Sequence, residues 1–140
     1  MTKDKQAAIS GVEKKAALIG EVADCIWDYA ELSLQEERSA AKYCAVLEAE
    51  GFTVERGICS IPTAFSASYG SGRPVIGLLA EYDALSGMSQ KAGSVEREET
   101  VPGGNGHGCG HNLLGAGAMA AALGVKAWLE QTGNPGTVIL

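Results

Sequence analysis

The chain has 140 residues, a length typical of about one domain. Hydrophobic residues make up 46% of it, which excludes a disordered chain, and the net charge of -6 argues against a nucleic-acid partner, which normally requires a basic face. No apolar run approaches the roughly 20 residues of a membrane-spanning helix. The charged N-terminus MTKDKQAAIS lacks the apolar segment of a secretory signal. We therefore expect a globular protein without a membrane partner.

The four cysteines, Cys25, Cys44, Cys59 and Cys109, show no regular spacing. The first three have apolar neighbours, which predicts buried free thiols. Unspaced free thiols are more typical of a reducing compartment than of a disulfide-stabilised protein, so we expect a cytoplasmic protein.

The first third of the chain predicts two helices. Apolar residues recur at alternating steps of three and four between residues 9 and 30, which predicts one helix of about six turns. The sequence SLQE that follows has the pattern of a capping box, in which the Ser33 hydroxyl and the Glu36 carboxylate would satisfy free N–H groups. The second helix is expected to contain residues 40–47 and to end at Gly51.

The periodicity then changes to that of strands. Residues 52–56 and 64–69 alternate between apolar and polar side chains. Residues 74–80, with the sequence PVIGLLA, are almost continuously apolar, which predicts a central strand buried on both faces. Residues 113–128 are rich in alanine and predict a buried helix, and residues 137–140 begin another buried strand.

This order of elements predicts a three-layer α/β/α domain with a mixed β-sheet. The 140 residues end within a strand that should lie in the core, so we expect an incomplete domain with an exposed apolar sheet edge at residues 138–140. Residues 86–106 show little periodicity, and a connection of that length is usually functional or disordered.

Two carboxylates follow the predicted central strand. Functional side chains in α/β sheets collect at the carboxyl ends of strands and at the start of the helices that follow. Glu81 and Asp83 are two residues apart, so an extended segment directs both side chains the same way. Two simpler interpretations stay open, namely that Asp83 forms a turn at the strand end and that Glu81 is a solvated carboxylate.

Both histidines of the chain lie in the glycine-rich sequence GNGHGCGHN at residues 104–112. Cys109 and His111 are two residues apart, and thiolate and imidazole are ligands that suit zinc and similar divalent ions. The intervening glycines would let the backbone direct both side chains to one point. Asn112 is a plausible N-cap for the next helix, whose N-terminus would favour the thiolate. Asp83 would then orient a ligand or bind the metal directly.

Other interpretations of this segment also stay open. A flexible surface turn would have a similar composition. His107 could be a metal ligand, could donate a hydrogen bond to a ligand or could be exposed, and the last two are favoured. Cys109 paired with His111 would also suit a nucleophile, although the glycines would hold it loosely. The sequence GAGAMA at residues 115–120 matches a dinucleotide-binding fingerprint, but no strand precedes it, and we interpret its glycines as sites of close helix packing.

The segments GLLAEYDAL and NGHGCGHNLLG resemble the signature segments of the M20 metallopeptidase family, in particular its amidohydrolase branch of the aminobenzoyl-glutamate hydrolase type. The resemblance implies a site for two divalent metal ions, zinc or manganese, that hydrolyses an amide bond of an N-acyl or aminobenzoyl amino acid. Cys109 and His111 match the metal-binding Cys-Gly-His element of that branch. Asp83 matches the aspartate that supports the metal site. Glu81 stands where related peptidases carry a metal-binding histidine.

The resemblance also implies features beyond these 140 residues. In the family the last strand leads into a Glu-Glu pair, one member of which is the general base, and further histidine ligands and a dimerising lid domain follow. We therefore expect residues 1–140 to be the N-terminal part of a catalytic domain that is inactive alone, and the complete protein to be a homodimer or hetero-oligomer. The alternative class is a stand-alone metal-binding or interaction module without catalysis.

Overall fold

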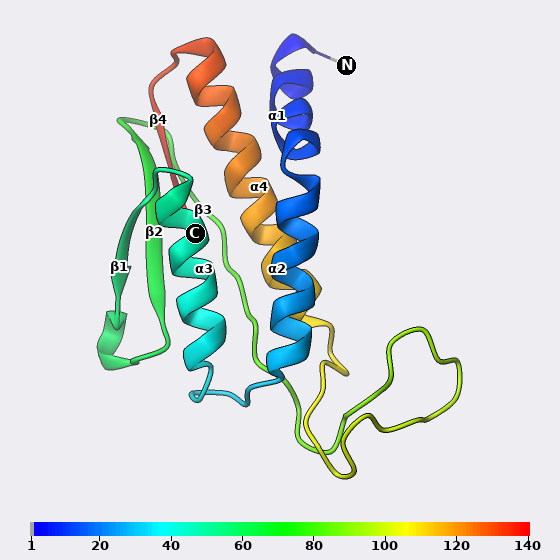
Figure 1. Cartoon of the computed structure of the whole chain (residues 1–140). Helices are drawn as coiled ribbons and strands as arrows, with labels where there is room; N and C mark the ends of the chain where they lie inside the picture. Colours follow the sequence, from blue (N-terminus) through cyan, green and yellow to red (C-terminus); the bar gives the residue numbers. More distant parts are fainter. Residues whose placement is uncertain (1) are drawn as a thin grey trace.

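The computed structural model describes residues 2–140, which form one block of helices packed on one sheet (Figure 1). The elements in chain order are α1 (Lys3–Lys14), α2 (Ala16–Tyr29), α3 (Glu37–Ala49), β1 (Thr53–Arg56), the 3-10 helix η1 (Ile58–Ser60), β2 (Phe65–Ser71), β3 (Val75–Gly77), α4 (His111–Thr132) and β4 (Gly136–Ile139). Helices α3 and α4 contact the sheet, and α1 and α2 pack against those two helices.

The four strands form a mixed sheet in the order β1-β2-β4-β3. β2 pairs antiparallel with both β1 and β4, whereas β3 and β4 run parallel. The α/β class with a mixed sheet is therefore confirmed. Because β3 and β4 are parallel, their carboxyl ends meet at the same edge of the sheet, and the segment that follows β3 begins there.

The prediction of a central strand at residues 74–80 is wrong. Only Val75–Gly77 is a strand, and it lies at the edge of the sheet with Val75 and Ile76 54% and 44% exposed. The inner strand of the parallel pair is β4, where Val138 is completely buried. The same arrangement corrects the expected exposed edge at residues 138–140, because Leu140 is also buried.

The predicted single helix over residues 9–30 is two helices that meet at Lys15. The break lets each half pack on a different surface: α1 contacts mainly α4, while α2 also contacts α3. Gly11 lies so close to Ala127 of α4 that a Cβ at this position would overlap the alanine side chain. The apolar stripe predicts burial only in its second half: Ala23 and Ile26 of α2 are buried, whereas Ile9 of α1 is 40% exposed.

The predicted capping box at the start of α3 does not form. Glu36 is the N-cap residue, but its side chain accepts no capping hydrogen bond. The carboxylate of Glu31 caps the helix instead, accepting the backbone N–H groups of Arg38 and Ser39 at 3.0 and 2.9 Å and the Ser39 hydroxyl at 2.7 Å. These are the free N–H groups of the first turn that a capping side chain normally satisfies.

The hydrophobic core lies between α2, α3, α4 and the sheet. Its completely buried members are Val22, Ile26, Tyr43, Leu47, Ala67, Met119, Ala122 and Val138. Helix α4 is, contrary to expectation, long and apolar enough to cross a membrane by length and composition alone. Because Met119 and Ala122 of α4 lie in this core, packing in the core explains the apolar composition of the helix.

The cysteines follow their predicted burial only in part. Cys44 is buried, and this burial raises the pKa of its thiol. Cys25 is half-buried, and Cys59 is exposed, which corrects its prediction. All four cysteines are free.

Candidate functional site

An extended segment after β3 carries the two predicted carboxylates to the edge of the sheet. Leu78 continues the pairing with β4 through a hydrogen bond from its N–H to the Ile139 carbonyl at 2.7 Å. The other end is fixed where the Ala84 N–H donates to the Glu31 carbonyl at 2.7 Å. Between these two hydrogen bonds the backbone cannot turn freely. Asp83 is consequently held at this edge with its side chain 23% exposed.

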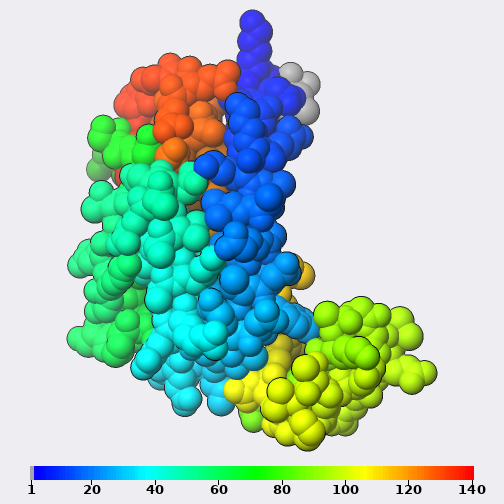
Figure 2. All heavy atoms as spheres, viewed as in Figure 1, coloured from blue at the N-terminus to red at the C-terminus, as the bar shows by residue number. Residues whose placement is uncertain are grey.

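A loop of residues 86–105 follows this segment and includes the first two residues of the glycine-rich sequence. It extends away from the body of the protein (Figure 2). Its base is closed by reciprocal backbone hydrogen bonds between Leu85 and Gly106, at 2.9 and 3.0 Å. The closed base brings Asp83 and His111 together although they are 28 positions apart in the sequence.

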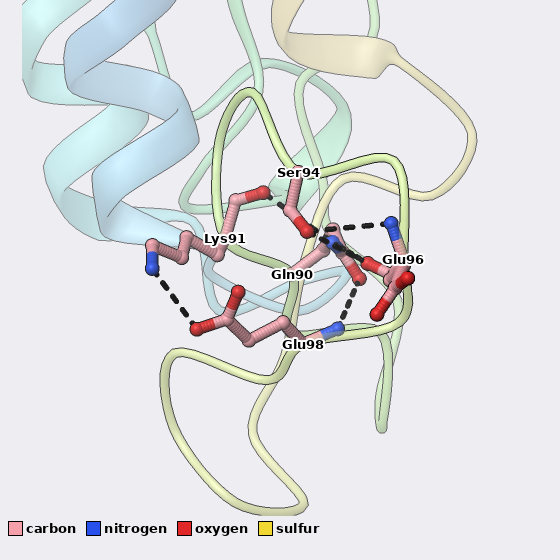
Figure 3. Close-up of polar contacts among 5 residues, drawn as sticks. All are labelled: Gln90, Lys91, Ser94, Glu96 and Glu98. Carbon is pink, nitrogen blue, oxygen red and sulfur yellow. Dashed lines mark hydrogen bonds and ion pairs between the residues drawn. The ribbon is translucent and has the colours of Figure 1, made fainter.

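The loop has a polar network of its own (Figure 3). The Gln90 side chain donates to the Glu96 carbonyl at 2.9 Å and accepts the Glu98 N–H at 3.2 Å. Lys91 and Glu98 form an ion pair at 3.0 Å. Of the two expectations for residues 86–106, a functional loop or a disordered one, these contacts disfavour disorder, because the loop adopts a defined shape without regular secondary structure.

Three side chains of the glycine-rich sequence attach it to helix α2. Each donates a hydrogen bond to a backbone carbonyl on or next to the C-terminal half of that helix. The bonds run from Asn105 Nδ2 to Ala30 at 3.1 Å, from His107 Nε2 to Ile26 at 2.9 Å and from Asn112 Nδ2 to Ala23 at 3.5 Å. Because these carbonyls are spaced three and four residues apart, they lie along one face of α2, and the sequence follows that face.

His107 is the most deeply anchored of the three. It is only 6% exposed and its ring stacks on Trp27 with centroids 6.2 Å apart, so the interpretation of an exposed His107 is wrong. A carbonyl oxygen can only accept, so Nε2 carries the proton and Nδ1 does not. Burial lowers the pKa of His107, which favours this neutral form.

A tight turn then follows, and Cys109 within it is exposed. The Gly110 N–H donates to the His107 carbonyl at 3.0 Å, and Gly110 has a positive φ of 76°. This conformation favours glycine, as expected from the permissive backbone of the segment. Gly110 is also the N-cap of α4, so the prediction of Asn112 as N-cap is wrong: Asn112 lies inside the helix and is buried.

His111 occupies the first position of α4, with its imidazole between the two carboxylates. Its Nδ1 lies 2.7 Å from Asp83 Oδ1, and its Nε2 lies 3.1 Å from Glu81 Oε2. The structure thus brings His111, Asp83 and Glu81 together and supports the inference that the two carboxylates point the same way. When Nδ1 donates to Asp83, the lone pair of Nε2 is free for a Lewis acid, a carboxylate–histidine arrangement that recurs in metal sites.

The exposed thiol of Cys109 does not join this group. Within residues 2–140 no three histidine, cysteine, aspartate or glutamate side chains are gathered closely enough to hold a metal ion. The donor set is nevertheless the one that zinc and related ions prefer, namely a thiol and an imidazole whose second nitrogen is fixed by a carboxylate. The described residues therefore fit part of a metal-binding set.

A hollow of about 460 Å³ opens beside His111. Glu81 and Asp83 line it, and so does Glu36, which sequence reasoning assigned to a helix cap. The sequence did contain a signal that Glu36 could be free for another role. Glu31 lies five residues before it, and only one carboxylate is needed to cap α3. Apolar and aromatic side chains form much of the remaining wall: Ile58, Ile61, Phe65, Leu78, Tyr82 and Leu140.

Comparison with known proteins gives relatives that are all described as hydrolases or peptidases. The chain is 56% identical over 118 residues to a subunit of the p-aminobenzoyl-glutamate hydrolase of Escherichia coli (strain K12), an alignment that covers 84% of this chain and 24% of that protein. It is 28% identical over 141 residues to Xaa-Arg dipeptidase of Mus musculus, covering 94% of this chain and 29% of the relative. The chain thus spans about a quarter of the length of these relatives. No protein-family model matches it.

Two solved structures share the fold. A proposed aminohydrolase from methicillin resistant Staphylococcus aureus superimposes with a TM-score of 0.68 at 25% identity, over 96% of this chain and 33% of that one. A Bacillus subtilis protein described as a dinuclear metal binding peptidase from the M20 family superimposes with a TM-score of 0.62 at 25% identity, over 89% of this chain and 35% of that one.

Proposed function

We propose that the chain is part of a metal-dependent amidohydrolase of the M20 family of peptidases and that it contributes Cys109, His111 and Asp83 to the metal centre. The observation that carries this proposal is the position of the His111 imidazole between Asp83 and Glu81 at the edge of the sheet. The relative described as a dinuclear metal binding peptidase supports a centre for two ions.

Each residue has a distinct role in the proposed centre. His111 Nε2 and the Cys109 thiolate would hold a divalent ion, zinc or manganese, while Asp83 accepts a hydrogen bond from Nδ1–H and so fixes the orientation of the ring. Glu81 places a carboxylate beside Nε2, where it can bind the same ion. A bound ion of this kind supplies Lewis acidity at the carbonyl of the scissile amide.

We propose an N-acyl or aminobenzoyl amino acid as the substrate, on the basis of the relative from the p-aminobenzoyl-glutamate hydrolase of Escherichia coli. That relative is named as one subunit of the enzyme, so we also propose that the complete protein assembles with other chains. The four free thiols support a location in the reducing cytoplasm. Because no three potential ligands within residues 2–140 are gathered closely enough to hold a metal ion, we expect no hydrolysis by these 140 residues alone.

Protection of Cys109 from alkylation tests the metal centre directly. Iodoacetamide should modify both exposed thiols, Cys109 and Cys59, while the buried Cys44 reacts slowly. Zinc should slow the modification of Cys109 and leave Cys59 unaffected, since a coordinated thiolate is not a free nucleophile. Peptide mass spectrometry reports both rates in one sample. In His111→Ala the protection should disappear.

Cys59 serves as the internal control for any general effect of zinc on alkylation. Equal rates at Cys109 with and without zinc would contradict the proposed ligand set. Protection that persists in His111→Ala would show that zinc binds the thiol without the histidine, and the assignment of a shared centre would be wrong.

A further inference from the structure

Glu36 has no structural partner in the helix that it begins. As the N-cap of α3 it could bond the free N–H groups of the first turn, but Glu31 already accepts those of Arg38 and Ser39. The Glu36 side chain is consequently free for another task.

The Glu36 carboxylate is buried without compensation. The residue is only 7% exposed, and its Oε2 is completely buried. Within residues 2–140 this oxygen has no hydrogen-bond partner. A buried carboxylate without a partner is destabilising by several times the contribution of an ordinary hydrogen bond, so proteins normally pair such a group or reserve it for a ligand.

The surroundings of Glu36 identify the kind of ligand. Among the described residues no lysine or arginine lines the hollow beside it, and the other two carboxylates there, Glu81 and Asp83, both contact His111. Glu36 is therefore the carboxylate that remains to accept hydrogen bonds from an occupant. Its accepting oxygens call for N–H donors, and the absence of lining cations disfavours an anionic group.

The walls next to Glu36 suit a flat apolar body. Phe65 and Tyr82 both line the hollow, and their rings stack with centroids 6.1 Å apart. The Tyr82 hydroxyl is engaged with the carbonyl of Thr63, which fixes this ring. Tyr82 and Glu36 line the same hollow, and the pKa of Tyr82 is raised by burial and further by the charge of Glu36. An aromatic ring with an amino substituent matches this combination of an apolar wall and an acceptor.

We propose that Glu36 is a specificity-determining residue that accepts hydrogen bonds from the amino group on the acyl part of the substrate, with the body of that group against Phe65 and Tyr82. This inference rests on the proposed function, since it assigns the amine-bearing end of the amide substrate to the hollow that His111 also lines. The shared chemistry is an N–H donor on an apolar body, which an aryl amine and an alkylammonium group both provide.

Binding of small amides to the 140-residue chain tests the assignment. Three probes share one ring: 4-aminobenzamide carries an aryl amine, 4-(aminomethyl)benzamide carries an ammonium group, and benzamide carries neither. Dissociation constants are measured by NMR titration for the native chain, for Glu36→Gln and for Glu55→Gln. Glu55 is the matched control because it is an exposed carboxylate on β1 outside the hollow.

At least one amine probe should bind the native chain roughly tenfold or more tightly than benzamide, as expected for a hydrogen bond to a charged group. Glu36→Gln should abolish that preference and Glu55→Gln should retain it. The two amine probes distinguish an aryl amine from an ammonium group. Equal binding of all three probes to the native chain, or an unchanged preference in Glu36→Gln, would overturn the proposal.

The stability of the ligand-free chain separates a ligand-binding role from a structural one. Removing an unpaired buried charge should leave Glu36→Gln at least as resistant to urea as the native chain. If Glu36→Gln is less stable than Glu55→Gln or fails to fold, Glu36 has a structural partner and the proposal is wrong. Neither measurement involves zinc or Cys109, so its failure would be distinguishable from failure of the proposed metal centre.

Discussion

Two glycines in the first turns of α4 should respond in opposite ways to replacement by alanine. Gly115 is buried, and a Cβ built on it would lie 2.5 Å from the Tyr43 hydroxyl and 2.8 Å from the Glu81 carbonyl oxygen. Gly117 is exposed, and a Cβ there would have no neighbour within 4 Å. The two positions share one helix, so the comparison isolates the effect of the contact.

The magnitudes follow from two opposing terms. Alanine in place of glycine inside a helix is stabilising by about 1 kcal/mol, and this term applies at both positions. At Gly115 the methyl group must also displace a completely buried tyrosine and the backbone of Glu81, an overpacking cost of about 2–3 kcal/mol. We therefore expect Gly117→Ala to stabilise the chain by about 1 kcal/mol. Gly115→Ala should destabilise it by about 1–2 kcal/mol.

Urea denaturation followed by far-UV circular dichroism measures both changes. The midpoints should move in opposite directions while the dependence on urea concentration stays the same, because neither variant alters the surface exposed on unfolding. If Gly115→Ala is as stable as Gly117→Ala, then α4 does not approach the Glu81 segment as described. The inference that a glycine is required beside the site would then be wrong.

Two further pairs of substitutions test the corrected features of the fold. Glu31→Gln should lower the free energy of unfolding by about 1–2 kcal/mol, since it weakens the cap of α3. Glu37→Gln in the exposed first turn should change it by less than about 0.5 kcal/mol, and equal losses would refute the capping role. Ile76→Thr should cost less than about 0.5 kcal/mol if β3 is an exposed edge strand. Val138→Thr, which buries a hydroxyl in the core, should cost about 1–3 kcal/mol, and a larger loss for Ile76→Thr would contradict the strand order.

The sequence predicted the types and order of the elements well, because periodicity reports which side chains avoid water. The sequence could not predict which other segments of the chain cover those side chains. Residues 74–80 are as apolar as a central strand, but β3 lies at the edge and β4 takes the inner position. An apolar run indicates a preference for burial, whereas the strand order depends on pairings between segments that are distant in the sequence.

Part of the candidate site was predictable from the spacing of residues in the sequence. The spacing of Glu81 and Asp83 fixes their common direction, and the structure places both beside His111. The role of His107 was not predictable, because its hydrogen-bond acceptor is the carbonyl of Ile26, 81 positions earlier. Because every residue has a backbone carbonyl, the pattern of side chains does not show which carbonyl accepts a hydrogen bond. The presence of two carboxylates near the start of α3 signalled that one of them was not needed as the cap, but only the structure shows that Glu31 is the cap and Glu36 is not.

The closed base of the loop at residues 86–105 has a consequence for how this protein tolerates changes of length. The Leu85–Gly106 bonds fix the two ends, so the distance between Asp83 and His111 does not depend on the number of residues that connect them. The free energy of closing a flexible loop changes slowly, and a fourfold change in length alters it by only about 1 kcal/mol. Insertions or a fluorescent tag at the exposed Val95 should therefore be accepted without displacing the histidine and its carboxylates, which makes this part of the loop a convenient attachment point for engineering.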